Sequence, residues 1–289
     1  MNIRTVSADT VESIPERRNN MLVKRIISAA AGIIYLIIVL YFRGWLFNIS
    51  VLIISLLGMH EFYASVRKKG HKPVSLLGYL YTIVFFYFVA TGLNSPIIPA
   101  SAIIAAIAAL FITVIIPRTT VMDACFTITG FIYPGMTLIT LIMMVNLPQP
   151  YAHYLLIFTM AATWSTDTFA YFIGIRYGKN KLCPGISPKK TVEGSLGGLG
   201  GSVLSGIITG WILQRFYQLP IGYEHYIIMS IICGFASQAG DLAASSIKRF
   251  CGIKDFGNIL PGHGGILDRF DSIMFTVPVI YAYYLICLV

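Results

Sequence analysis

Charged side chains are scarce in this chain. Its 289 residues include 21 lysines and arginines and 12 aspartates and glutamates, so fully charged residues make up only 11%. A soluble domain uses about a quarter of its residues for charge. Hydrophobic residue types reach 56%, and the mean hydropathy is +0.76. This composition excludes a soluble globular protein and a disordered tail, and it indicates a membrane protein.

Cysteine pairs and common nucleotide-binding motifs are also lacking. The five cysteines are scattered and form no C-x-x-C pair, so neither a disulfide scaffold nor a zinc site is predicted. Walker A and G-x-G-x-x-G patterns are absent, and the glycine run at 194–201 therefore predicts close helix packing rather than a nucleotide cradle. The net charge of +9 indicates basic loops that face an anionic membrane surface, not nucleic acid.

What the chain does have is apolar runs, and nine of them reach the roughly 20 residues that a membrane-spanning helix needs. They lie at about 24–42, 45–66, 74–92, 97–117, 121–146, 151–175, 195–215, 224–247 and 270–289. With the N-terminus in the cytoplasm, every basic residue except Arg43 and Arg215 falls on the cytoplasmic side, as the positive-inside rule requires. The predicted fold class is all-α, a polytopic membrane protein of about nine transmembrane helices with a cytoplasmic N-terminus.

The pattern divides the chain into three parts. Residues 1–20 form a polar tail, 21–150 the N-terminal transmembrane helices, and 151–289 a C-terminal transmembrane region. The last part carries two basic, glycine-rich loops, 176–194 and 248–269, both predicted to be cytoplasmic. Lysine and arginine supply charge for phosphate, and glycine permits close backbone approach. The loops therefore predict either a phosphate site or a solvated basic face on anionic lipid.

Four aspartates lie in or beside the predicted spans of the C-terminal region: Asp167, Asp241, Asp268 and Asp271. A charge inside a span costs several kcal/mol unless it is paired, hydrated or metal-bound, so such residues are functional candidates. The i,i+3 spacing of Asp268 and Asp271 places both on one helical face. No basic residue within the spans offers itself as a partner for Asp167 or Asp241. A divalent cation with hard oxygen ligands, such as Mg²⁺, would balance these charges.

Plainer interpretations of the same acidic residues stay open. The i,i+3 pair could be first-turn residues favoured by the helix dipole, and the other two could be hydrogen-bonded residues of the helix bundle. Glu61 and Asp123 lie near span ends and are expected at the membrane interface.

The polar residues of the C-terminal half also form a recognisable signature. Residues 246–255 read S-I-K-R-F-C-G-I-K-D, and 260–271 read L-P-G-H-G-G-I-L-D-R-F-D. An upstream block over 164–201 includes Trp164, Asp167, Ser187-Pro188 and Lys190-Thr191. Together these blocks resemble the phosphatidate cytidylyltransferase (CDP-diacylglycerol synthase) family, whereas residues 1–150 match it only in being hydrophobic spans.

The resemblance implies that the cytidylyl group of CTP is transferred to phosphatidic acid, giving CDP-diacylglycerol and pyrophosphate for phospholipid biosynthesis. It further implies a requirement for Mg²⁺, a homodimer, and an active site that faces the cytoplasm from the inner cell membrane. Nucleic acid is not an expected partner.

The resemblance also assigns roles to the polar residues. The carboxylates Asp241, Asp268 and Asp271 would hold Mg²⁺, and their number leaves a second cation open. The remaining assigned residues would contact the substrates: Lys248, Arg249, Lys254 and Arg269 hold phosphates, His263 donates to a phosphate oxygen, Ser187, Lys190 and Thr191 line the entrance, and Asp167 contributes to substrate binding. Because the attacking phosphate is already ionised, no general base is assigned.

Two other functions remain alternatives at this point. A CTP-dependent kinase of a polyprenol-type alcohol would keep the nucleotide and change the acceptor. A cation transporter could use the acidic residues as an ion path, but their charges crowd at one side of the predicted membrane rather than crossing it.

Overall fold

The computed structural model describes residues 27, 30–32, 34–42, 44–92, 97–217, 221–260, 262 and 264–288, so the predicted tail at 1–20 lies outside the described residues. The described chain is mostly helical. Its helices are residues 30–32 with 34–42, α2 (Gly44–Lys68), α3 (Ser75–Ala90), α4 (Ile97–Ile115), α5 (Val121–Gly130), the π-helix η1 (Phe131–Met136), α6 (Thr137–Val145), α7 (Tyr151–Tyr177), α8 (Val192–Tyr217), α9 (Tyr223–Phe250), α10 (Leu267–Phe270) and α11 (Ile273–Cys287).

Within the described ranges, five helices are long and apolar enough to cross a membrane. They are α2, α4, the continuous helix from α5 through η1 to α6, α8 and α9. Helices α3 and α11 are apolar but shorter, and α7 falls outside this set. The chain is therefore a multi-pass membrane protein, as predicted from composition. The count of nine spans and the orientation of the N-terminus stay predictions.

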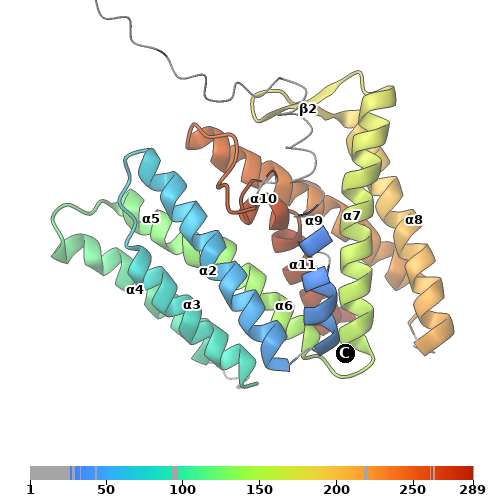
Figure 1. Cartoon of the computed structure of the whole chain (residues 1–289), viewed down its shortest axis with the longest axis horizontal. Helices are drawn as coiled ribbons and strands as arrows, with labels where there is room; N and C mark the ends of the chain where they lie inside the picture. Colours follow the sequence, from blue (N-terminus) through green and yellow to red (C-terminus); the bar gives the residue numbers. More distant parts are fainter. Residues whose placement is uncertain are drawn as a thin grey trace, which may run out of the picture.

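The helices form two groups with a shared centre (Figure 1). Helices α2 to α6 lie on one side and α7 with α8 on the other, while α9 and α11 lie between them. Helix α11 contacts α6, α7 and α9, so it joins the two groups.

Helices α7 and α8 pack at very short distance because glycines remove the side chains between them. A β-carbon at Gly197 would overlap the Ile173 side chain, and one at Gly201 would overlap the Phe169 ring. Gly198 likewise faces the backbone oxygen of Thr166. The prediction that the 194–201 run serves helix packing is confirmed.

A small β-hairpin corrects the all-α prediction. Strands β1 (Lys181–Cys183) and β2 (Ser187–Thr191) pair antiparallel within the predicted loop 176–194. Pro184 and Gly185 occupy the turn between them, which suits their backbone preferences. Both strands are edges, so Pro188 is tolerated in β2. Strands of three and five residues are too short for a periodic signal, so the residue pattern did not predict them.

Candidate active site

A cavity of about 760 Å³ lies where α7, α8, α9, the hairpin and the segment leading into α11 meet. It gathers much of the scarce charge of this chain. Five of the twelve acidic residues line it (Asp167, Asp241, Asp255, Asp268 and Asp271), together with five basic ones (Lys181, Lys189, Lys190, Lys248 and Arg269). Clefts with clustered titratable groups are the usual place for catalysis or ligand binding. This cavity is the candidate active site.

On one wall, Asp241 of α9 forms an ion pair with the hairpin. Lys190 Nζ lies 2.7 Å from Asp241 Oδ2, and the side chains of Lys190 and Asp241 are 26% and 34% exposed. Ser245, one turn further along α9, donates to Asp241 Oδ1 over 3.4 Å. The sequence offered no basic partner for Asp241 within the spans, and the hairpin supplies one, Lys190, from outside them.

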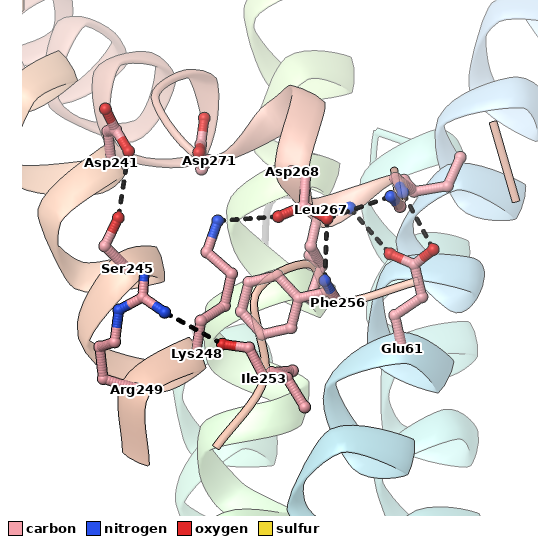
Figure 2. A network of polar contacts seen from close by, with 12 residues as sticks. Glu61, Asp241, Ser245, Lys248, Arg249, Ile253, Phe256, Leu267, Asp268 and Asp271 are labelled. Carbon is pink, nitrogen blue, oxygen red and sulfur yellow. Dashed lines mark hydrogen bonds and ion pairs between the residues drawn. The ribbon is translucent and has the colours of Figure 1, made fainter. Parts of the chain in front are cut away.

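In the segment leading into α11, Asp268 is held far more tightly (Figure 2). Lys248 Nζ donates to Asp268 Oδ1 over 2.8 Å, and the aspartate side chain is only 3% exposed. Its Oδ2 accepts the backbone N–H groups of Phe256 at 2.8 Å and Gly265 at 3.1 Å. Lys248 also lies over the Phe256 ring, 5.5 Å from its centroid. Both oxygens of Asp268 are thus occupied by the protein.

The remaining two predicted carboxylates, Asp167 and Asp271, have fewer hydrogen-bond partners than Asp268 among the described residues. Asp271 Oδ1 accepts a hydrogen bond from the backbone N–H of the next residue, Ser272, at 2.8 Å. Asp167 Oδ1 accepts a hydrogen bond from the Ser237 hydroxyl at 3.2 Å. Neither forms an ion pair with a lysine or arginine among the described residues. Asp271 lines the same cavity as Asp268, as the i,i+3 spacing predicted. Carboxylates from α7, α9 and the α10–α11 segment do converge.

The donor set can be tested against Mg²⁺. In the part of the chain that the structure describes, no three His, Cys, Asp or Glu residues are close enough to hold a metal on their own. Magnesium, however, is usually bound through one or two carboxylates together with substrate phosphates and water. Asp241 and Asp271, which both border the cavity, fit that mode. The oxygens of Asp268 are engaged in the present arrangement.

Eight of the predicted site residues line the cavity: Asp167, Lys190, Thr191, Asp241, Lys248, Asp268, Arg269 and Asp271. Three others do not border it. Arg249 instead donates from Nε to the Ile186 oxygen over 3.1 Å and so ties the hairpin turn to α9, while Ser187 begins β2 and Lys254 is exposed beyond α9. His263 lies outside the described residues.

Sequence reasoning assigned no role to some lining residues. Gln238 of α9 donates from Nε2 to the Ser195 oxygen of α8 over 3.1 Å, and the Ser195 hydroxyl bonds back to its Oε1. Gln238 precedes Asp241 by three residues, and this spacing could have revealed that both lie on one face of α9. Asp255 also borders the cavity.

Glu61 is buried inside the protein. It is only 3% exposed, and its two oxygens accept the N–H groups of Ile266 at 3.0 Å and Leu267 at 2.9 Å. Asp123 is equally buried, and it accepts N–H groups from Lys72 and Thr120. Distant backbone donors satisfy Glu61, and one distant and one neighbouring donor satisfy Asp123, so both carboxylates are buried inside the protein. Their expected place at the membrane interface stays a prediction.

Comparison with known proteins identifies the family of this chain. The model of the Cytidylyltransferase family matches residues 23–287. This chain belongs to the cytidylyltransferase family. The match includes the N-terminal helices as well as the C-terminal half that carries the recognisable signature, so the family extends to α2 and Glu61.

Individual relatives agree with the family match. The chain is 38% identical to a phosphatidate cytidylyltransferase of Bacillus subtilis over 240 residues, which are 80% of this chain and 86% of that protein. It is 32% identical to a phosphatidate cytidylyltransferase of Synechocystis over 295 residues, covering 93% and 98%. A Staphylococcus saprophyticus phosphatidate cytidylyltransferase is 42% identical over 163 residues, 56% of this chain and 60% of its own length. The resemblance read from the sequence is confirmed.

Proposed function

We propose that this protein transfers the cytidylyl group of CTP to phosphatidic acid and forms CDP-diacylglycerol and pyrophosphate for phospholipid biosynthesis. One observation carries the proposal. In an apolar helical member of the cytidylyltransferase family, five carboxylates and five basic side chains line a single cavity. Basic groups suit the phosphates of both substrates, and carboxylates suit the cation that accompanies a nucleoside triphosphate.

The proposed membrane placement has nine spans and puts the N-terminus and the cavity on the cytoplasmic side of the inner membrane. The distribution of basic residues supports this orientation. A cytoplasmic cavity receives CTP from solution and phosphatidic acid from the adjoining leaflet. We include a homodimer, which the family resemblance implies, and no nucleic acid partner.

The proposed reaction is a direct displacement at phosphorus. A phosphate oxygen of phosphatidic acid forms a bond to the α-phosphorus of CTP. The bond from that phosphorus to the bridging oxygen breaks, and its electron pair leaves with pyrophosphate. Lys190, Lys248 and Arg269 would orient the phosphates by charge and hydrogen bonds. The nucleophile is already ionised, so the chain needs no residue that removes a proton.

The carboxylates contribute through a cation in this proposal. Mg²⁺, when bound, would neutralise the triphosphate and the departing pyrophosphate. Asp241 and Asp271 would hold it together with substrate phosphates. Asp268 would support the site by fixing Lys248, or it would release Lys248 and become a further ligand of the cation. A second cation would be held by the carboxylate oxygens of Asp167.

The test is a product assay with purified protein in mixed micelles. Labelled CTP and phosphatidic acid should yield labelled CDP-diacylglycerol only when Mg²⁺ is present, and mass spectrometry should identify the product. The Asp241→Asn variant is the matched control, since it keeps the shape of the side chain and removes the charge. A phosphorylated alcohol as product, or cation flux in liposomes without nucleotide, would overturn the proposal.

A further inference from the structure

Glu61 is a buried carboxylate that the proposed reaction does not use. It belongs to α2, yet its hydrogen-bond partners Ile266 and Leu267 lie more than 200 residues further along the chain. Figure 2 shows its carboxylate facing the backbone directly before Asp268. A backbone-bound carboxylate at this place joins the N-terminal helices to the wall of the cavity.

The hydrogen bonds of this segment form an unbroken series. The backbone N–H of Gly265 donates a hydrogen bond to Asp268, and the next two N–H groups, those of Ile266 and Leu267, donate to Glu61. Asp268 in turn holds Lys248 in the cavity. Two carboxylates thus fix three consecutive peptide groups, those of residues 265 to 267. A shift of the peptide groups bound to Glu61 would therefore also move Asp268.

The packing leaves the Glu61 carboxylate no room to move. A β-carbon at Gly257 or at Gly265 would overlap its oxygens, and one at Gly58 in the same helix would touch the Leu267 side chain. The segment that carries Asp268 is therefore held from two directions, by close contact and by charge-assisted hydrogen bonds, which are stronger than neutral ones.

We propose that Glu61 is a positioning residue for cytidylyl transfer: it holds the peptide groups of residues 266 and 267 so that Asp268 and Lys248 keep their orientation in the cavity. Glu61 is not among the residues that line the cavity. Its influence passes through the backbone to Asp268. The inference rests on the proposed function, because it names a residue that supports that reaction.

The experiment compares Glu61→Gln with Asp123→Asn. Asp123 is the matched control, since it is equally buried, accepts two backbone N–H groups, and does not border the cavity. Glutamine keeps the length of the side chain but offers one oxygen to two donors. We expect kcat of Glu61→Gln to fall about 100-fold, the cost of a small displacement of catalytic groups. KM for CTP should change less than about threefold, because Glu61 makes no contact with the hairpin lysines.

Two further measurements separate positioning from stability. Hydrogen exchange of the 264–268 amides should be faster in Glu61→Gln, whereas Asp123→Asn should affect residues near 72 and 120 and leave kcat within about threefold of wild type. Glu61→Asp keeps the charge and withdraws the carboxylate by one methylene. Its kcat should also fall, since a role of charge alone would be rescued by aspartate.

The outcomes distinguish this inference from the proposed function. If wild-type protein makes no CDP-diacylglycerol, the proposed function fails and Glu61 has no reaction to support. If wild type is active and folded Glu61→Gln or Glu61→Asp keeps its kcat, only the inference is overturned. Failure of both variants to fold, while Asp123→Asn folds, would assign Glu61 to stability alone and would also overturn it.

Discussion

The two walls of the cavity hold their acidic residues in different ways. On the α9 wall, Asp241 contacts Lys190 of β2 and Ser245 among the described residues, and both of these partners are side chains. On the loop wall, which carries Asp255, Asp268, Arg269 and Asp271, the Asp268 side chain is buried and bound to two backbone N–H groups as well as to Lys248. A side-chain partner can swing away when a ligand arrives, whereas a backbone donor moves only with the chain. The loop wall therefore acts as a frame and the α9 wall as the adaptable side.

The largest effect should come from breaking the frame with Asp268→Asn. This change leaves Lys248 charged, only 12% exposed and without its partner. Removing one member of a buried ion pair costs about 3–5 kcal/mol. We expect a fall of at least about 6 °C in the melting temperature of the purified protein, together with loss of activity. Thermal unfolding of the purified variant in detergent measures the change in melting temperature.

A double variant checks the cause of that loss. Lys248→Met combined with Asp268→Asn removes both charges, and replacing a whole buried pair is often nearly neutral for stability. The double variant should therefore regain most of the lost melting temperature and stay inactive. A single Asp268→Asn variant that melts like wild type would remove the distinction between the two walls.

On the adaptable wall, Asp241→Asn should affect activity rather than stability. Its side chain is one-third exposed and accepts no backbone hydrogen bond from the residues that the structure describes, so little folding energy depends on it. A group that binds the reacting phosphates, directly or through a cation, contributes about 10²–10³ in rate. We expect kcat/KM to fall by about that factor while the melting temperature stays within about 2 °C of wild type. An equal loss of stability in both aspartate variants would contradict the comparison.

Sequence alone predicted the parts of this fold that repeat a pattern. Apolar runs predicted the helices, and the glycine run at 194–201 predicted close helix packing, for which the structure supplies the partner, α7. The hairpin was missed because its strands are very short and its residues polar. The π-helical turn at Pro134 was missed too, since a wider turn inside an apolar run leaves the periodicity almost unchanged.

The candidate active site could likewise be predicted only in part. The aspartates of 167, 241, 268 and 271 stood out because charge is costly in a span, and the structure brings them to one cavity. Their partners could not be deduced. Lys190 reaches Asp241 only through the hairpin, and Glu61 reaches residues 266 and 267 across most of the chain. Long-range pairs of this kind follow from tertiary packing, which the spacing of residues does not encode.

The smallest effect on activity among these variants should come from Lys190→Met, and this variant sharpens the comparison most directly. Lys190 and Lys248 each pair with an aspartate of the cavity at nearly the same distance, 2.7 and 2.8 Å, but Lys190 is 26% exposed and Lys248 is 12% exposed. A partly exposed pair contributes about 0–1 kcal/mol after solvent screening. Lys190→Met should therefore leave the melting temperature within about 2–4 °C of wild type. If Lys190 exchanges Asp241 for a phosphate of CTP, KM for CTP should still rise about tenfold, which corresponds to about 1.4 kcal/mol of binding. Unchanged KM in a folded Lys190→Met variant would mean that the pair persists when the nucleotide binds, and the α9 wall would then be as fixed as the loop wall.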